Sequence, residues 1–289
     1  MVSSSAKRSR YHRLRYHRCV LSDLVFARTW QNNREPVSKS FAALTRFLSK
    51  RLGCRVAPKV SLSYEELSRG LRERTVDVAW LPPIVHAQLA RKDEVRTMLT
   101  SVREQRSSCV IVCKRDGRIA TLDDVRTARA AWVDPWSAAG YVMPRLFLFE
   151  HDIDPRTSLL EERFLGSHEA AVRAVADGVA DIAATFARLD ERGEVVAAGW
   201  SGVPDSAHAL RVVSVVGSIP PDVLACRASL AEDVSAAMSA ALLAAIDLPD
   251  VSADARASFE VDGFASPTTH DASLALLASL EKAGSLFPK

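Results

Sequence analysis

The sequence predicts an α/β protein of two similar lobes with a cleft between them. From residue 20 to about 114, apolar runs and amphipathic stretches alternate as strand, helix, strand, helix, strand, helix, strand, strand. From about 130 to 185 the chain repeats the plan as strand, helix, strand, helix, strand. Two strands crossing between such halves would place a cleft at the C-terminal ends of the lobes' strands, where α/β proteins bind ligands.

The first half starts with a strand at about 21–27. It continues with a helix whose apolar face repeats at Val37, Phe41, Leu44, Leu48 and Leu52 and which ends at Gly53. The remaining elements of this half are strands at 55–62, 76–81, 95–102 and 108–114, with helices that start at the capping box Ser63–Glu66 and at Pro82-Pro83.

The second half opens with a second capping box, Thr121–Asp124, and a strand at 130–133. A helix to about residue 150 follows the turn at Asp134-Pro135. The later elements are a short strand at 164–165, a helix from Gly166 to Gly178, strands at 180–185, 210–216 and 223–226, and alanine-rich helices at about 229–247 and 270–283.

Size and composition describe a globular protein. The chain has 289 residues, of which 48% are hydrophobic and 25% are charged, enough for two domains. The net charge is +3, yet the six Lys and Arg of residues 1–18 are accompanied by no acid, so the rest of the chain is slightly acidic. A basic nucleic-acid-binding protein is thereby excluded, and no nucleic-acid partner is expected.

Residues 1–19 are predicted to form a basic, disordered head. Arg-Tyr-His-Arg occurs there twice, at 10–13 and 15–18, a pattern that could also contact RNA or an acidic membrane surface. No apolar core of a signal peptide follows, and no stretch approaches the length of a membrane span. As written, the chain is expected in the cytoplasm; a misassigned start would instead allow a periplasmic or cell-surface protein.

The stretch from Trp132 to Tyr141 is the first candidate for a ligand site. Its short apolar strand turns and enters a helix whose first turn holds Ser137, Ala138, Ala139 and Gly140. The first N–H groups of a helix lack partners inside the helix, and its dipole favours negative charge there. The stretch therefore predicts an anion site, although many α/β proteins have such a turn without using it.

Other polar or aromatic groups end strands or begin helices, and a cleft would bring them together. They are Tyr64, Trp80, His86, Trp136, Tyr141, His168 and Asp181. Each has a structural alternative: Tyr64 could pack on its own helix, Trp80 could belong to the core, and Asp181 could cap a neighbouring backbone. His168 could be a ligand donor or simply a neutral hydrogen-bonding residue.

Signatures of catalysis and metal binding are missing from the sequence. It contains no GxSxG, P-loop, GxGxxG or HExxH pattern. The seven His are scattered, and no His/Cys/Asp cluster has metal-ligand spacing, so neither a metal nor a cofactor is expected. The five Cys have no CxxC spacing and indicate buried, reduced thiols: Cys19, Cys54, Cys109, Cys113 and Cys226.

In order and spacing these motifs resemble the PhnD-like family of phosphate, phosphite and phosphonate solute-binding proteins of ABC transporters. The resemblance covers about residues 20–285 and rests on the segments Ser63–Leu67, Val76–Pro83, Thr121–Val125, Trp132–Pro144, Phe164–Val172 and Gly178–Ala184. It implies a type 2 periplasmic-binding-protein fold with two α/β lobes, two hinge strands and a ligand cleft. Lobe 1 would comprise residues 20–112 and 214–289, and lobe 2 residues 113–213.

The resemblance also implies how the site works and where it departs from the family. The family's helix start reads Ser-Thr-Ser-Gly or similar; Ser137 matches its first hydroxyl, while Ala138 and Ala139 replace the next two. The match extends to Tyr64, His168 and Asp181 at pocket positions, whereas His86 stands where a Tyr is common. Each lost neutral hydrogen bond would weaken binding by about 0.5–1.5 kcal/mol.

The function implied is that of a non-catalytic binding protein whose lobes close on a small oxyanion or phosphonate-like ligand, with an ABC permease as partner. A cytoplasmic sensor with a diverged pocket is an alternative on the same fold. So is an enzyme that uses His168 or Asp181 as acid or base.

Overall fold

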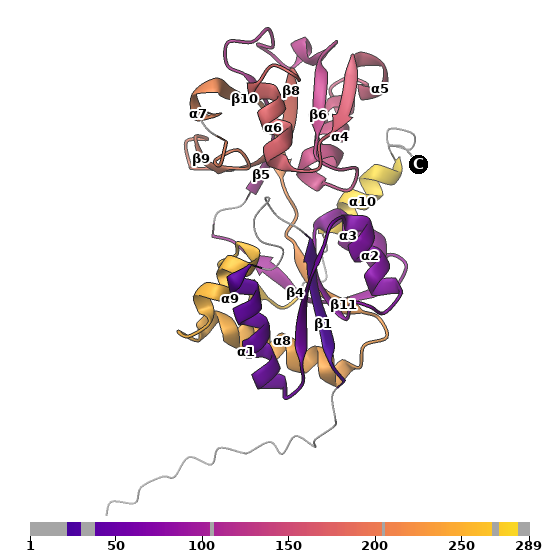
Figure 1. Cartoon of the computed structure of the whole chain (residues 1–289). Helices are drawn as coiled ribbons and strands as arrows, with labels where there is room; N and C mark the ends of the chain where they lie inside the picture. The colour runs from indigo at the N-terminus through magenta and orange to yellow at the C-terminus, as the bar shows by residue number, and fades with distance from the viewer. Residues whose placement is uncertain (1–21, 30–37, 105–106, 204–205, 268–271, 283–289) are drawn as a thin grey trace, which may run out of the picture.

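Two α/β lobes, each with its own sheet, make up the protein (Figure 1). The computed structural model describes residues 22–29, 38–104, 107–203, 206–267 and 272–282, so the predicted basic head lies outside the described residues. The two-lobe α/β prediction is confirmed.

Lobe 1 is built on a six-stranded sheet in the order β12-β4-β11-β3-β1-β2. Strand β1 pairs in parallel with β2, the edge strand, and with β3, and β11 runs antiparallel to β3 and β4. Its elements are β1 (Leu24–Thr29), α1 (Lys39–Leu52), β2 (Val56–Ser61), α2 (Tyr64–Arg72), β3 (Val78–Leu81), α3 (Pro83–Ala90), β4 (Val95–Val102), β11 (Val223–Arg227), α8 (Glu232–Asp247), α9 (Ser252–Phe259), β12 (Gly263–Ala265) and α10 (Ala272–Lys282).

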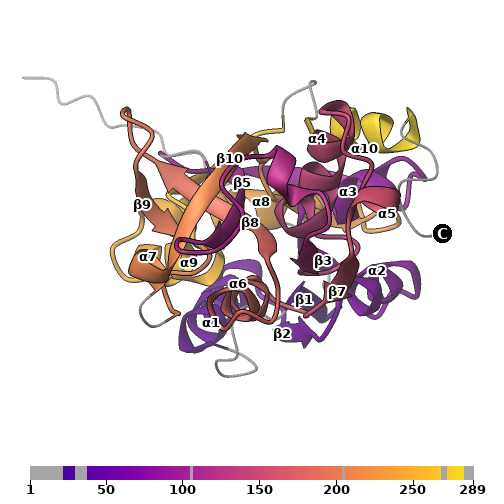
Figure 2. The same ribbon diagram turned by 90° about the horizontal axis from the view of Figure 1, so that it is seen from above.

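Lobe 2 is built on a sheet in the order β10-β5-β8-β6-β7, with β9 paired to β8. In Figure 2, α4 and α6 lie on opposite faces of this sheet, and each covers its own apolar cluster. The elements are β5 (Ser107–Lys114), η1 (Asp123–Val125), β6 (Arg129–Trp132), η2 (Ala138–Val142), α4 (Met143–Glu150), α5 (Pro155–Ser158), β7 (Glu161–Phe164), α6 (His168–Ala176), β8 (Ile182–Leu189), β9 (Val195–Ala198), α7 (Ser206–Ala209) and β10 (Leu210–Ser218).

The chain crosses between the lobes after β4 and again before β11. Strands β5 and β10 pair with each other antiparallel from Ser108–Ser218 to Lys114–Leu210, inside the sheet of lobe 2. Division points at 112/113 and 213/214 would cut through this pair. Sheet pairing therefore assigns both strands to lobe 2, because their ladder hydrogen bonds are made there.

Local sequence signals explain several element ends. Gly53 adopts a left-handed conformation at φ 72° and ends α1, as its position predicts. Ser63 caps α2 by accepting the Glu66 N–H, but the Glu66 carboxylate accepts the N–H of Leu62, one residue before the cap. Within the part of the chain that the structure describes, no single helix is long and apolar enough to cross a membrane; α8 and α9 pass that test only as a pair bent by 109°.

The lobes also touch beside the crossings. Trp136 of lobe 2 packs against the apolar cluster of lobe 1 that contains Leu67 and Leu81, while also covering its own lobe's core. Helix α10 lies beside α3 (Figure 1) and sends Leu276 and Leu280 against the core of lobe 2. These contacts fix the walls of the space that remains between the lobes.

Candidate functional site

A cleft of about 630 Å³ lies between the two lobes. Segments that follow β2, β3, β6 and β7 form much of its wall, so the C-terminal ends of parallel strands meet here as the sequence predicts. Its lining includes Thr29, Tyr64, Trp80, Pro82, Pro83, Ser101, Arg103, Ser107, Ser137, Ala138, Ala139, Gly166, Ser167, His168, Phe186, Arg188, Ser218, Asp222 and Glu260.

The turn after β6 presents a helix N-terminus to this cleft. The Asp134 carboxylate accepts the Trp136 N–H at 2.8 Å and the Asp134 carbonyl accepts the Ser137 N–H at 2.9 Å, which starts the turn. Ser137 is 4% exposed, and its hydroxyl then accepts the Gly140 N–H at 3.0 Å. Because a helix start leaves its first N–H groups without intrahelical acceptors, those of Ala138 and Ala139 remain for a ligand.

A glycine is required at position 140. A Cβ there would lie 2.3 Å from Val133 Cγ2 and 2.8 Å from Ser137 Oγ. The close approach lets the Gly140 carbonyl accept the Val133 N–H at 3.1 Å, which ties the turn to the end of its own strand. The turn continues as η2, a π-helical segment, a distortion frequent at functional sites.

A second helix N-terminus, that of α6, opens on the same cleft. Ser167 caps it by accepting the Ala170 N–H at 3.1 Å, and Gly166 precedes it at φ 80°. His168 Nδ1 lies 2.9 Å from the Thr185 hydroxyl, and burial lowers the pKa of His168 to about 4. The imidazole is therefore neutral at physiological pH.

Lobe 1 contributes an aromatic wall. Tyr64 is the first residue of α2 and only partly buried. Burial and the negative charges of Asp134 and Asp222 raise the pKa of Tyr64, so its phenol keeps its proton. Trp80 is 3% exposed and stacks on Phe259 with ring centroids 4.7 Å apart, so it is mainly a core residue with one edge at the cleft.

Charged side chains gather where the chain crosses between the lobes. Arg103 forms an ion pair with Asp222 at 2.9 Å and donates to the Glu260 carbonyl at 3.0 Å. Burial raises the pKa of Asp222, and the Arg103 charge opposes that shift. Arg188, from the end of β8, and Glu260, at the end of α9, line the cleft from opposite lobes.

Five residues predicted for the site lie outside the cleft lining, and two of them, His86 and Asp181, have polar partners elsewhere in the protein. His86 is fully buried on α3, where Nδ1 lies 2.9 Å from the Ser273 hydroxyl and Nε2 lies 2.8 Å from that of Thr97. It joins α3 to α10 and β4 instead of facing a ligand. The apolar character of α3 around the whole helix explains why this His points into the protein.

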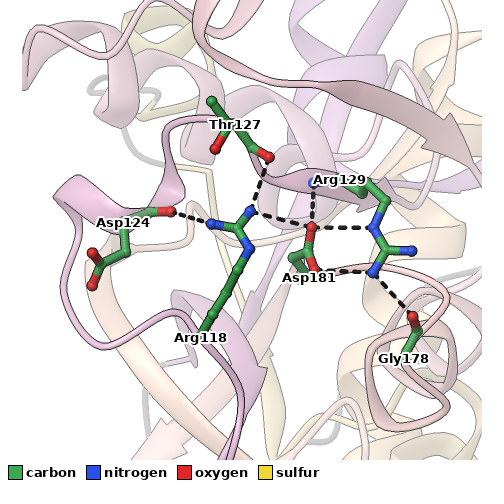
Figure 3. Close-up of polar contacts among 6 residues, drawn as sticks. All are labelled: Arg118, Asp124, Thr127, Arg129, Gly178 and Asp181. Carbon is green, nitrogen blue, oxygen red and sulfur yellow. Dashed lines mark hydrogen bonds and ion pairs between the residues drawn. The ribbon is translucent and has the colours of Figure 1, made fainter.

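Asp181 is the second of these. It precedes β8 at the end of the strand opposite to Arg188 and is held by Arg129 and Arg118 (Figure 3). Hydrogen bonds from Arg129 lower the pKa of Asp181 to about 2 against the effect of partial burial. Its carboxylate also accepts the Arg129 N–H at 2.8 Å, so it is a structural residue, the alternative that the sequence left open.

Three further predicted residues support the site from behind. Gly140 shapes the turn, and Trp136 packs between the lobes, but neither lines the cleft. Tyr141 is 2% exposed; its ring packs edge-on against Trp132 and Phe164, with the Arg145 guanidinium 5.2 Å from its centre. Conversely, Tyr64, Trp80, Ser137, Ala138, Ala139 and His168 all line the cleft.

The charged residues of the cleft escaped the sequence prediction. Arg103, Arg188, Asp222 and Glu260 lie in no motif; two flank the crossings, one ends β8 and one ends α9. The turn Pro220-Pro221 before Asp222 was the one local sign of a special segment. Among the described residues no group of three or more His, Cys, Asp or Glu could hold a metal ion.

Comparison with known proteins gives the family. Residues 26–272 match the family model described as the periplasmic substrate-binding protein of a phosphonate ABC transporter. The chain belongs to this family. It is thus a solute-binding protein of the phosphonate-transporter class, as the resemblance predicts, and the type 2 periplasmic-binding-protein fold is confirmed.

Solved structures agree in fold. One is PhnD1 from Prochlorococcus marinus in complex with methylphosphonate, with TM-score 0.75, 16% identity, and 90% of this chain and 98% of that chain covered. A second is a binding protein of a phosphonate ABC transporter from Pseudomonas aeruginosa, with TM-score 0.74, 19% identity and coverage of 90% and 85%. A third is a Xanthomonas citri protein bound to chloride, with TM-score 0.73, 19% identity and coverage of 90% and 98%.

Proposed function

We propose that this family member binds a small phosphonate- or phosphate-like oxyanion in its cleft and releases it unchanged to a transporter. The observation that carries the proposal is the meeting of two helix N-termini, at Ser137–Ala139 and Ser167–His168, on one wall of the cleft. Each cap accepts one N–H and leaves the earlier ones for an anion, whose charge the helix dipoles also favour.

Three side chains complete the proposed oxyanion site. The Ser137 hydroxyl can donate to a ligand oxygen while it accepts the Gly140 N–H. The Tyr64 phenol stays protonated and can donate from the opposite lobe. With Nδ1 of His168 engaged by Thr185, Nε2 is the ring atom that remains for a ligand.

A role in binding rather than catalysis fits the chemistry of His168. A pKa of about 4 makes this imidazole a weak base at neutral pH, far from the value that suits a general base. Within the described residues its recorded hydrogen-bond partner is a hydroxyl, not an orienting carboxylate. A cleft filled by Trp136 would have favoured a sensor with a degenerate pocket, but Trp136 does not line the cleft, which stays open.

Transport by an ABC permease follows from the same proposal. A ligand held between Tyr64 of lobe 1 and Ser137 of lobe 2 would favour closure of the lobes about the two crossings. We expect a permease to recognise the closed form. The family assignment places such proteins in the periplasm, and this location is proposed for the chain.

Isothermal titration with methylphosphonate, phosphite, phosphate and 2-aminoethylphosphonate tests the proposal. We expect heat of binding and a raised melting temperature with at least one of them, and the ³¹P spectrum of the recovered ligand should be unchanged. No heat and no thermal shift with any of the four would refute the oxyanion site. A new phosphorus signal would refute the non-catalytic role.

The two alanines of the turn offer a gain-of-function test. Ala139→Ser restores a hydroxyl at a cleft-lining position where the family pattern has one. A new hydrogen bond to the charged oxyanion should tighten methylphosphonate binding by about 1.5–3 kcal/mol, roughly 10- to 150-fold. Leu160→Ser, at an exposed position outside the cleft lining, is the control and should leave affinity unchanged.

A further inference from the structure

The cleft is larger than a bare phosphonate requires. A group of five heavy atoms occupies on the order of 150 Å³ if each atom takes about the volume of a water molecule. The cleft measures about 630 Å³ and continues from the helix N-termini to the crossings between the lobes. An oxyanion bound at Ser137 and His168 would leave the crossing end free for the rest of a larger ligand.

This crossing end carries charges of both signs, and within the described residues two of them form no ion pair. Among the described residues Arg188 makes no ion pair or side-chain hydrogen bond, and the Glu260 carboxylate accepts none. Arg28 acts on Glu260 only through longer-range attraction. Glu260 is exposed and Arg188 is half-buried, so water solvates both charges in the open cleft, and a ligand that displaces this water must supply charges of opposite sign.

The other two charged residues, Arg103 and Asp222, form an ion pair with each other, but Asp222 can still accept a hydrogen bond. Arg103 is held by Asp222 and by the carbonyls of Phe259 and Glu260. Asp222 receives this single ion pair and lines the cleft, so it can accept a further hydrogen bond. One wall of the crossing end thus offers two carboxylates, from Asp222 and Glu260, and the other offers the guanidinium of Arg188.

We propose that the ligand is an α-amino acid that carries a phosphonate or phosphate on its side chain. Arg188 binds the α-carboxylate, Glu260 and Asp222 bind the α-ammonium group, and the helix N-termini bind the oxyanion. A guanidinium suits a carboxylate because it offers two parallel N–H donors. This inference rests on the proposed function, since it places the oxyanion at the same helix N-termini.

A matched ligand series tests each charge separately by isothermal titration. 2-Amino-3-phosphonopropanoate has all three groups, 2-aminoethylphosphonate lacks the carboxylate, 3-phosphonopropanoate lacks the ammonium, and ethylphosphonate lacks both. O-phosphoserine replaces the phosphonate by a phosphate ester. We expect 2-amino-3-phosphonopropanoate to bind at least about ten-fold tighter than any of the three analogues that lack one or both of the other charged groups. Comparison with O-phosphoserine then shows whether the oxyanion of the ligand is a phosphonate or a phosphate ester.

Titration of three variants with the same ligands tests which residue contacts each charged group. Arg188→Gln should abolish the advantage of 2-amino-3-phosphonopropanoate over 2-aminoethylphosphonate while leaving the affinities of 2-aminoethylphosphonate and ethylphosphonate unchanged. Glu260→Gln should reduce its advantage over 3-phosphonopropanoate, because Asp222 alone would then bind the ammonium group. Arg173→Gln, which removes a positive charge from an exposed position of α6 outside the cleft lining, should change none of these ratios.

Three outcomes overturn the inference. Equal affinities of ethylphosphonate and the amino acid would show that the crossing end of the cleft does not bind the carboxylate and ammonium groups. If Arg188→Gln lowered the affinity for all ligands by the same factor, Arg188 would instead be a residue that holds the lobes together. Failure of every ligand, ethylphosphonate included, would refute the proposed oxyanion site as well, so the two failures are distinguishable.

Discussion

Replacing Ser137 by alanine separates the two roles that the structure gives its hydroxyl. The residue is 4% exposed, and its hydroxyl caps the turn by accepting the Gly140 N–H at 3.0 Å. Loss of an N-cap costs about 1 kcal/mol, and a buried N–H left without an acceptor costs about 1–3 kcal/mol. We therefore expect the free energy of unfolding, measured with urea, to fall by about 1–3 kcal/mol.

The same change should weaken ligand binding. A hydrogen bond to a charged group contributes about 1.5–3 kcal/mol, so the Kd for methylphosphonate should rise by about 10- to 150-fold. Ser63→Ala is the matched control, because Ser63 caps α2 through the Glu66 N–H at 3.1 Å but is exposed and lies outside the cleft lining. It should cost about 1 kcal/mol of stability and leave the Kd unchanged.

Comparison of the two variants decides the matter. If Ser137→Ala loses stability but binds methylphosphonate as the unaltered protein does, the hydroxyl is only a cap, and the site must be sought elsewhere in the cleft. If Ser63→Ala weakens binding equally, the effect comes from general loosening of the fold. Either result would refute the assignment of Ser137 to the ligand.

Further predictions follow from packing and charge. Gly140→Ala should lower stability by about 1–3 kcal/mol in urea unfolding, because its Cβ would lie 2.3 Å from Val133 Cγ2; unchanged stability would refute the close approach. Because burial lowers the pKa of His168 from 6.5 to about 4, the unfolded chain binds a proton between these values that the folded chain does not. The free energy of unfolding should therefore fall by about 3 kcal/mol as pH drops through this window. In His168→Gln, urea unfolding measured at a series of pH values should no longer show this decrease. Asp181→Asn removes a partly solvated ion pair with Arg129 and should cost about 1–2 kcal/mol while the Kd for methylphosphonate stays constant; weaker binding would return Asp181 to the site.

The sequence indicated the lobes and most of their elements because the signals are local. Alternating apolar runs, capping residues and glycines act over a few residues, and Ser63 and Gly53 do in the structure what their positions predict. The Thr121–Asp124 box was less reliable: Asp124 accepts both N–H groups of Ala120 and Thr121, and only the short helical turn η1 follows.

What the sequence determined by itself is the family and the part of the cleft lining at Tyr64, Ser137–Ala139 and His168, because these residues lie in continuous segments at strand ends. Tertiary structure alone decided which titratable residues line the cleft. Asp181 and His86 satisfied their polar groups within the protein, through Arg129 and through Thr97 and Ser273. Arg188, Asp222 and Glu260 reach the cleft from separate strands and helices, and no pattern along the chain records which distant elements will meet.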